Sequence, residues 1–388
     1  MKKSLFSVVI LVYRHYEYLK TALDSVLSQD YDNIELIVSD DGSPGFPAAK
    51  IQKYIDENKG NNITSVLVRC EPQNVGTVRH LNHVRKHCSG DYIAFLAGDD
   101  AFYGTQALTS YHLGFLNAPS NCYVEMAQTA MLDEKLKNVL GYYMTKPVQD
   151  ALVETACSTD TLKKMLAEFG ACLPTTSTCF KKEFFEHFGD FDERYKLVED
   201  FPMHCRLANE NYIIHYVNCV TIKHRDGGIS HGQNDTLSAS SRSYYSDVLK
   251  MDRELVLPLV DQLPPKERKF ARRRWMKEIL WLDSMLSHNN LKPGVRAFAY
   301  GLLRFVKGDF KKVEPKRFAF FNLFVLLSLV KGWIGQMYIQ EFSFNMGKIL
   351  GCISWLAFAV YVFLAIETGI RRLWWRIKKF PREVISLG

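Results

Sequence analysis

The sequence lacks the signatures of several common classes of enzyme and binding protein. Its nine cysteines are scattered and include no CxxC pair, so neither a disulfide framework nor a zinc site is indicated, and reduced cytosolic thiols are expected. Neither GxGxxG nor GxxxxGK(S/T) follows the first apolar segment, so a dinucleotide dehydrogenase and a P-loop enzyme are both unsupported. No small-residue cleavage site follows the apolar run Leu5–Val12, which is therefore predicted to be a buried strand rather than a signal peptide.

Acidic residues are scarce toward the end of the chain. From Pro264 to Gly388 there are 23 Lys and Arg residues against 8 Asp and Glu, a net charge of +15, which leaves −8 for residues 1–263. The two parts differ in kind, so a boundary near residues 235–265 is expected. We predict a first domain over residues 1–235, a helical linker or accessory region over 236–315, and a membrane-associated region over 316–388.

Apolar periodicity in the first hundred residues alternates between that of strands and that of helices. The pattern predicts helices at His15–Gln29, about Pro47–Glu57 and about Gly76–His87, separated by strands at Ser7–Tyr13, Ile34–Ser39 and Ile63–Val68 and by the apolar run within Asp91–Asp100. Such alternation is typical of a doubly wound, mostly parallel α/β sheet with right-handed crossovers. Further strands at Cys122–Met131 and Thr175–Phe180, with a helix at Thr159–Phe169, are expected to complete a mixed sheet.

Carboxylates follow two of these strands directly. Asp40-Asp41 closes the second strand and Asp99-Asp100 closes the fourth, while Tyr13 ends the first. Because the carboxyl ends of parallel strands line one crevice, these groups are predicted to face a shared ligand site. Adjacent carboxylates repel each other, and a divalent cation such as Mg²⁺, completed by substrate phosphate oxygens, would relieve that repulsion. A solvated Asp-Asp turn is the simpler interpretation of either pair taken alone.

The motifs resemble the inverting family 2 glycosyltransferases with the GT-A fold. The resemblance covers about residues 4–232, and it rests on Ser7–Ile10, Leu27–Tyr31, Glu35–Ser43, Asn74–Gly76, Gly90–Ile93, Leu96–Asp100, Phe188–Glu193, Glu199-Asp200 and Gly227–Ser230. Two departures stand out. Leu11-Val12-Tyr13-Arg14 replaces the usual Pro-Thr-Tyr-Asn, and Ala97 replaces the first acid of the family's Asp-x-Asp-Asp.

The resemblance implies a donor side for the site. Asp41 would contact the nucleotide base, with Tyr13 stacking or lining beside it. Asp99 would contact the ribose or the metal shell, and Asp100 would ligate Mn²⁺ or Mg²⁺ under the donor diphosphate. The metal-side histidine of the family falls at His224, with the register uncertain by one residue.

The resemblance also implies that Asp200 is the general base. An inverting transfer needs an acceptor hydroxyl deprotonated on the face opposite the leaving group, and a positioned carboxylate does this. Glu199-Asp200 also reads as the acidic first turn of a helix, which is compatible with that role. Arg79 could reach the donor base or phosphates, although a solvated helix face is an equal alternative. We assign His80, His83 and His87, on the same predicted helix, to the surface.

The end of the sequence predicts membrane association. Ile349–Ile366 contains eighteen residues without a charge and is followed by the basic and aromatic stretch Arg371–Lys379, which is typical of a membrane interface. Phe318–Ile339 is apolar apart from Lys331, and a hairpin of the two segments would keep both basic flanks in the cytosol. Interfacial or re-entrant helices are the alternative, and Arg272–Trp275 could lie on lipid or form a solvated basic face.

Together these features predict a metal-dependent inverting glycosyltransferase at the cytoplasmic face of a bacterial inner membrane. It would move a sugar from a nucleotide diphosphate donor, with a UDP-sugar expected, to a hydroxyl of a lipid-linked or cell-surface glycan. The alternative is a non-catalytic module that recognises a glycan or nucleotide on the same fold. No nucleic-acid partner is expected, because the basic residues flank apolar runs; nucleic-acid binding would appear as salt-sensitive retention by residues 264–388.

Overall fold

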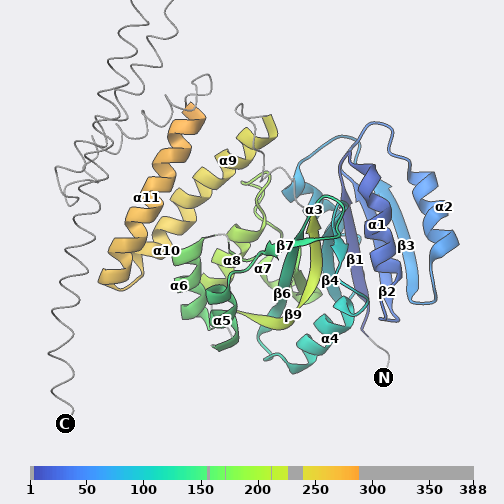
Figure 1. The fold of residues 1–388 in the computed structure, drawn as a ribbon, viewed down its shortest axis with the longest axis horizontal. Helices are drawn as coiled ribbons and strands as arrows, with labels where there is room; N and C mark the ends of the chain where they lie inside the picture. Colours follow the sequence, from blue (N-terminus) through green and yellow to red (C-terminus); the bar gives the residue numbers. More distant parts are fainter. Residues whose placement is uncertain (1–3, 155–157, 171, 211, 226–238, 288–388) are drawn as a thin grey trace, which may run out of the picture. The chain divides into compact units, whose positions relative to one another are not determined.

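A computed structural model describes residues 4–154, 158–170, 172–210, 212–225 and 239–287 (Figure 1). The chain divides into two compact units, Met1–Trp275 and Met276–Gly388. The helices expected between residues 236 and 275 therefore belong to the first unit. Within the described residues no helix is long and apolar enough to cross a membrane. The predicted segments Phe318–Ile339, Ile349–Ile366 and Arg371–Lys379 lie outside the described residues.

The amino-terminal part confirms the predicted alternation. Its parallel strands stand in the order β3-β2-β1-β4. The strands are β1 (Phe6–Val12), β2 (Ile34–Asp40), β3 (Ile63–Cys70) and β4 (Tyr92–Ala97), and the connecting helices are α1 (Tyr16–Leu27), α2 (Ala48–Asn58) and α3 (Thr77–Arg85). The predicted and observed bounds differ by no more than a few residues, as expected from helix and strand ends that fray.

The two faces of this sheet have separate apolar cores because successive strand residues point to opposite faces. Phe6, Val8 and Ile10 of β1 share one core with α1, α2 and α4 (Ala107–Asn117). Val9 instead joins the core that contains α3 on the other face. Helices thus cover both faces, which is the doubly wound arrangement expected from the sequence.

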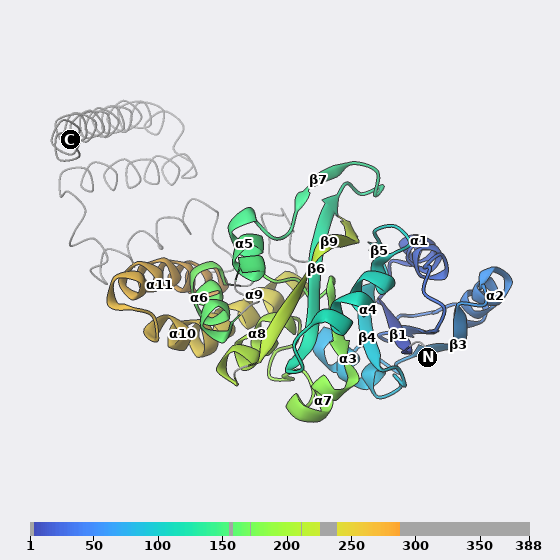
Figure 2. The same cartoon turned by 90° about the horizontal axis from the view of Figure 1, so that it is seen from below.

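The rest of the sheet is mixed, so "mostly parallel" holds only for the first four strands. The full order of the nine-stranded sheet in the described residues is β3-β2-β1-β4-β8-β6-β9-β5, with β7 paired to β6 (Figure 2). Pairs β4–β8, β6–β8, β5–β9 and β6–β7 are antiparallel, and β6–β9 is parallel. These strands are β5 (Ala101–Phe102), β6 (Cys122–Leu132), β7 (Val139–Tyr142), β8 (Thr178–Lys181) and β9 (Ile213–Arg225).

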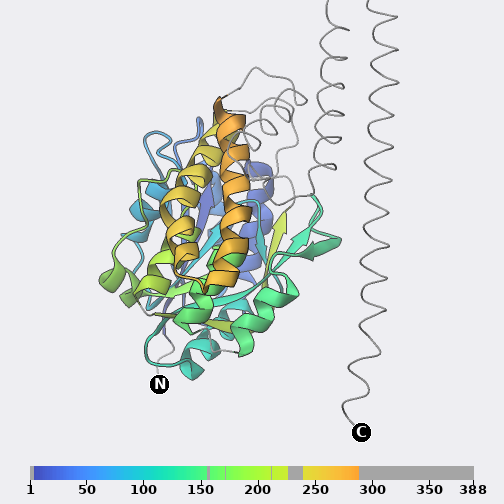
Figure 3. The same ribbon diagram turned by 90° about the vertical axis from the view of Figure 1, so that its left-hand side faces the viewer.

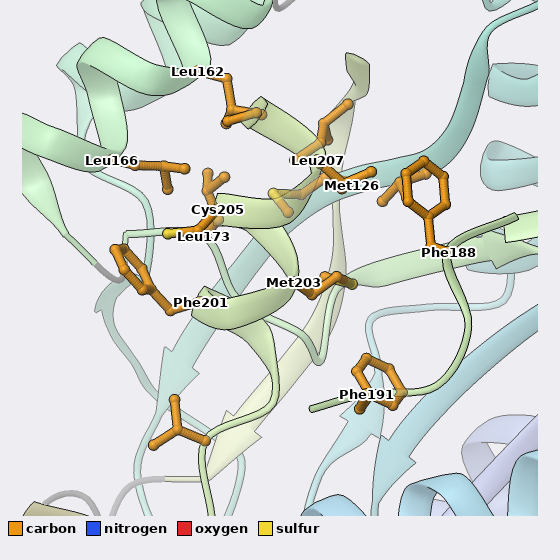
Figure 4. Close-up of a cluster of buried hydrophobic side chains, with 14 of the residues drawn as sticks. Met126, Leu162, Leu166, Leu173, Phe188, Phe191, Phe201, Met203, Cys205 and Leu207 are labelled. Carbon is orange, nitrogen blue, oxygen red and sulfur yellow. The ribbon is translucent and has the colours of Figure 1, made fainter. Parts of the chain in front are cut away.

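Helix α8 (Asp200–Asn209) lies at the centre of the second core. Its Phe201, Met203, Cys205 and Leu207 pack with Met126 of β6 and with Leu162 and Leu166 of α6 (Thr159–Phe169), as Figure 4 shows. Two short helices, α5 (Lys146–Glu154) and α7 (Lys182–Phe188), complete this part. The start of α8, where Asp200 lies, is therefore held by a helix that is almost entirely buried.

Three helical segments after residue 238 pack onto this core (Figure 3). They are α9 (Ala239–Met251), a π-helical segment (Asp252–Val256) and α10 (Leu257–Asp261). Pro258 does not interrupt the helix, and the π-helical segment lies directly before it. The break at Pro264-Pro265 is real, since α11 (Pro265–Ser287) begins there.

The basic stretch in α11 does not present its tryptophan to lipid. Trp275 is 4% exposed, and its indole N–H donates to the carbonyl of Ala167 at 2.6 Å. Arg272 pairs with Asp261 at the end of α10. Trp275 is therefore a core residue that ties the start of α11 to α6.

The surface assignment of one histidine is wrong. His80 is buried, and its Nε2 lies 2.7 Å from the hydroxyl of Ser39, which Arg69 also contacts. Burial and the charge of Arg69 lower the pKa of His80 to about 4, so the neutral ring shares a hydrogen bond with the Ser39 hydroxyl. The helical spacing of His80, His83 and His87 is real, but only His87 is fully exposed, and His83 contacts Glu71.

We predict that His204 makes the fold sensitive to acid. This side chain is fully buried in α8, its two ring nitrogens have no hydrogen-bond partner among the described residues, and burial lowers its pKa to about 3. An unfolded chain binds a proton at His204 below about pH 6.5, whereas the folded chain does not. Stability is therefore independent of this group above about pH 6.5 and falls by up to about 1.4 kcal/mol per pH unit below it.

Urea unfolding of the wild type and of His204→Leu between pH 7.5 and pH 5 measures this effect. The leucine variant should lose less stability on acidification and should be at least as stable near neutral pH, because two buried polar atoms are removed. His87→Leu, at an exposed position, is the matched control and should keep the wild-type pH dependence. Equal pH dependence in wild type and His204→Leu would contradict the assignment.

Candidate functional site

The carboxyl ends of β1, β2 and β4 lie side by side, as predicted. Leu11 is in register with Ser39 on one side and with Ala97 on the other. Beyond the last ladder positions, the N–H of Asp41 donates to the carbonyl of Val12 at 2.8 Å, and the N–H of Gly98 donates to that of Leu11 at 2.8 Å. The pairs Asp40-Asp41 and Asp99-Asp100 therefore lie at the same edge of the sheet, on either side of Tyr13.

Asp99 and Asp100 differ in their environments. Asp100 is 1% exposed, and both of its carboxylate oxygens are engaged by protein groups. Asp99 is half-buried, and its pKa is raised by burial and by repulsion from Asp100. The pair is therefore a local concentration of negative charge at which a cation would be stabilised.

An antiparallel pairing brings His224 to Asp100. Ala101 and Phe102 of β5 pair with Lys223 and Ile222 of β9, so the next residue on each strand, Asp100 and His224, face one another. His224 Nδ1 lies 2.9 Å from Asp100 Oδ2. With a proton on Nδ1 the ring donates to the carboxylate, which orients the lone pair of Nε2 away from Asp100, the arrangement typical of metal-binding histidines.

Arg225 makes different contacts from His224, and which of the two takes the metal-side position stays a prediction. Its backbone N–H donates to Asp100 Oδ1 at 3.0 Å, and its side-chain Nε donates to the carbonyl of Asp99 at 2.9 Å. Its guanidinium carbon lies 3.9 Å from the ring centre of Tyr18 in α1. The sequence contained no signal for Tyr18, because this contact joins residues more than 200 positions apart.

Asp41 organises a loop of the site. Its carboxylate is 4% exposed and accepts hydrogen bonds from the N–H groups of Val75 and Gly76 and from the side chain of Asn74, at 2.8 to 3.0 Å. Burial nevertheless raises its pKa. Gly42 follows with φ of 72°, and a Cβ there would lie 2.3 Å from the backbone of Gln73, so only glycine allows this close approach.

Tyr13 and Arg14 form the exposed corner beside Asp41. Tyr13 is 39% exposed at the end of β1, a position compatible with stacking on a ligand. Arg14 has φ of 65°, which is strained for a residue with a side chain, and its N–H donates to the hydroxyl of Ser43 at 2.8 Å. Its guanidinium lies 4.9 Å from the ring of Tyr13. The departure from the family pattern therefore coincides with a strained turn at the site.

Arg79 lies on the solvent side of α3. Its Nε donates to Glu193 at 3.2 Å, and both side chains are largely exposed. This geometry matches the alternative of a solvated helix face, and a role for Arg79 toward a nucleotide stays a prediction.

Asp200 is the first residue of α8, and it follows Glu199 at the cap position. Both carboxyl groups are half-buried, and burial raises the pKa of each, with repulsion from Asp200 adding to the shift at Glu199. A carboxylate with a raised pKa at a rigid helix start has the properties of a general base.

The segment before Asp200 is tied to the loop that Asp41 organises. The N–H of Val78, in the first turn of α3, donates to the carbonyl of Lys196 at 3.3 Å. Asp247 of α9 in turn accepts the N–H groups of Lys196 and Leu197 at 2.7 and 2.6 Å. Helix α9, which the sequence placed in an accessory region, therefore positions the segment that leads to Asp200.

The residues present fit a divalent metal that is completed by its ligand. No group of three His, Cys, Asp or Glu side chains converges on one point in the described part of the chain. Mg²⁺ and Mn²⁺ nevertheless bind to transferase sites through one or two carboxylates, with phosphate oxygens and water as the remaining ligands. Asp99 and Asp100, with His224 beside Asp100, could supply the one or two carboxylates of such a site.

Comparisons with known proteins match the part of the chain that carries β1 to β4. Residues 7–108 match the model "Glycosyl transferase family 2". An uncharacterized glycosyltransferase from Rickettsia typhi is 29% identical over 201 residues, which are 51% of this chain and 57% of that protein. Another from Haemophilus influenzae is 37% identical over 100 residues, 26% of this chain and 38% of that protein. The matches thus span about half the length of these curated relatives or less.

Among solved structures, Staphylococcus aureus TarS 1-349 in complex with UDP-GlcNAc is similar to this chain. The identity is 15% and the TM-score 0.49, with 89% of this chain and 90% of that chain covered. The family model covers β1 to β4, the segment that carries both acidic pairs. Residues 7–108 of this chain therefore belong to glycosyl transferase family 2, a family of sugar-transferring enzymes.

Proposed function

We propose that the protein is an inverting, divalent metal-dependent glycosyltransferase. It moves a sugar from a nucleotide diphosphate donor, a UDP-sugar in the simplest case, to a hydroxyl group of a lipid-linked or cell-surface glycan. The observation that carries the proposal is that Asp41, and Asp99-Asp100 with His224 in contact, lie at the same carboxyl edge of a family 2 glycosyltransferase domain. Ligands of open α/β sheets bind at that edge.

The donor side follows from the residues at the strand ends. Asp41 accepts three hydrogen bonds from the protein, and a carboxylate has about four acceptor positions, so one remains for a base N–H. Tyr13 supplies an exposed aromatic face beside it, and Arg79 is a more distant candidate on α3. Asp99, Asp100 and His224 would hold Mn²⁺ or Mg²⁺, which supplies positive charge to the departing diphosphate.

The acceptor side follows from Asp200. Its side chain would remove the proton of the acceptor hydroxyl as that oxygen attacks the sugar, while the nucleotide diphosphate leaves from the opposite face. Burial favours this step because it raises the proton affinity of the carboxylate toward neutral pH. Helix α8 fixes the direction of the side chain, and Asp247 fixes the preceding segment.

The lipid-linked acceptor and the position at the cytoplasmic face of a bacterial inner membrane rest on the sequence beyond residue 287. The net charge of +15 over Pro264–Gly388, with long apolar runs, suits attachment to an anionic membrane surface. An enzyme held at such a surface meets acceptors that are themselves anchored in lipid. The competing proposal, a non-catalytic glycan- or nucleotide-binding module, predicts ligand binding without turnover.

Thermal unfolding with UDP-, GDP- and dTDP-sugars, each with and without Mn²⁺, tests the donor side. One family of nucleotides should raise the unfolding temperature, and Mn²⁺ should increase the shift. At a ligand concentration of 100 times Kd the stabilisation is about 2.7 kcal/mol. Asp100→Asn should abolish the Mn²⁺-dependent part, whereas Glu57→Gln, on the exposed face of α2, should behave like the wild type. An unchanged metal response in Asp100→Asn would rule out this metal site.

Steady-state transfer assays of Asp200→Asn test the acceptor side. Loss of a general base should lower kcat by about 100- to 10,000-fold, with nucleotide binding retained. In the wild type kcat should rise with pH through the raised pKa of Asp200, because only the deprotonated carboxylate accepts a proton, and this limb should vanish in the variant. Glu210→Gln, at the other end of α8, is the control. Loss of nucleotide binding in Asp200→Asn would instead indicate a structural role.

A further inference from the structure

Arg225, the last residue of β9, is a buried cation at the carboxyl edge of the sheet. It is 7% exposed, and a guanidinium stays charged at any physiological pH. Its side chain has two contacts, with the carbonyl oxygen of Asp99 at 2.9 Å and with the face of Tyr18 at 3.9 Å. Both contacts are with uncharged groups.

This cation has no ion-pair partner within 4.0 Å among the described residues, although the carboxylates of Glu17 and Asp99 interact with its charge over a longer distance. Most other arginines of the described part that are similarly enclosed have such a partner. Arg69 pairs with Glu71 and Arg85 pairs with Asp190. A buried guanidinium whose terminal nitrogens make no hydrogen bond is costly, and a π face with one carbonyl offsets only part of that cost. The site therefore favours the arrival of an anion beside Arg225.

The geometry of Arg225 is fixed in advance. Its backbone N–H bonds to Asp100, its Nε bonds to the backbone of Asp99, and its guanidinium lies over the ring of Tyr18. Tyr18 is itself held by a hydrogen bond from its hydroxyl to Glu134 at 3.2 Å. The two terminal nitrogens of the guanidinium have no hydrogen-bond partner among the described residues, and their fork matches two oxygens of a phosphate.

We propose that Arg225 binds the pyrophosphate group of the nucleoside diphosphate, supported on Tyr18. This inference rests on the proposed function and assigns the diphosphate a second positive contact besides the metal. His224 and Arg225, adjacent in sequence, then have separate tasks. His224 contacts the carboxylate that would hold the metal, and Arg225 meets the phosphate oxygens directly. Arg225 also offsets the repulsion between the ligand and the two acids.

Calorimetric titration of the full-length protein with inorganic pyrophosphate and with UDP tests the proposal. Pyrophosphate makes the result independent of the donor base. Arg225→Gln should weaken the binding of either by about tenfold to a hundredfold, the usual range for a lost hydrogen bond to a charged group. Arg225→Lys keeps the charge but loses the fork and should bind with intermediate affinity. Lys53→Gln, on the exposed face of α2, should bind like the wild type.

Variants of Tyr18 separate phosphate binding from a merely structural role. Tyr18→Leu removes the aromatic support and should weaken pyrophosphate binding, whereas Tyr18→Phe keeps the ring and should retain it. The affinity of the wild type should also fall more steeply with salt than that of Arg225→Gln, because one phosphate contact is missing from the variant. A purely structural arginine would lower the unfolding temperature without changing this salt dependence.

The outcomes are distinguishable from those of the proposed function. Unchanged pyrophosphate affinity in a folded Arg225→Gln would overturn the proposal even if sugar transfer is observed. If Arg225→Gln fails to fold, the pyrophosphate affinities of Arg225→Lys, Tyr18→Leu and Tyr18→Phe test the proposal instead. Arginine-dependent binding of pyrophosphate without any sugar transfer would support this inference and contradict the proposed function. A wild type that binds neither pyrophosphate nor UDP would contradict both.

Discussion

Two neighbouring carboxylates at the end of a buried strand are the electrostatic constraint on which this site depends. Asp99 and Asp100 repel each other, and burial strengthens that repulsion because little water remains to screen it. Groups from one short segment offset part of this repulsion. His224 and the N–H of Arg225 contact Asp100, and the side chain of Arg225 contacts the Asp99 carbonyl. A bound cation, with an anionic ligand beside it, would offset the remaining repulsion between Asp99 and Asp100.

The second acidic pair is organised in a different way. Asp40 is fully buried and accepts the N–H and hydroxyl of Ser43, which shapes the turn after β2. Asp41 holds the Asn74–Gly76 loop, and that loop contacts the segment before Asp200. The Asp41 loop and the segment before Asp200 are thus connected through hydrogen bonds of the backbone. Helix α9 is part of this connection, and it lies well beyond the segment that the family model matches.

Much of the fold could be predicted because its signals are local. Buried parallel strands appear as short apolar runs and helices as 3.6-residue periodicity, so β1 to β4 and α1 to α3 were predicted within a few residues. Strand β9 was missed although Ile214 and Tyr216 alternate with more exposed residues, because its polar positions weaken the pattern. His80 was wrongly assigned to the surface because helical spacing shows only which residues lie beside it on α3. Ser39 of β2 contacts it and Arg69 of β3 contacts Ser39, and both of these residues lie outside α3.

The sequence by itself determined the α/β alternation, the family of its first hundred residues, and the placement of Asp41 and Asp99-Asp100 at strand ends, since each depends on residues close together in the chain. Only the tertiary structure decided that His224 faces Asp100, that Arg225 lies on Tyr18, and that α9 holds the approach to Asp200. These contacts join residues about 50 to more than 200 positions apart. Strand pairing and helix packing bring these residues together, and neither is visible as a periodic pattern in the sequence.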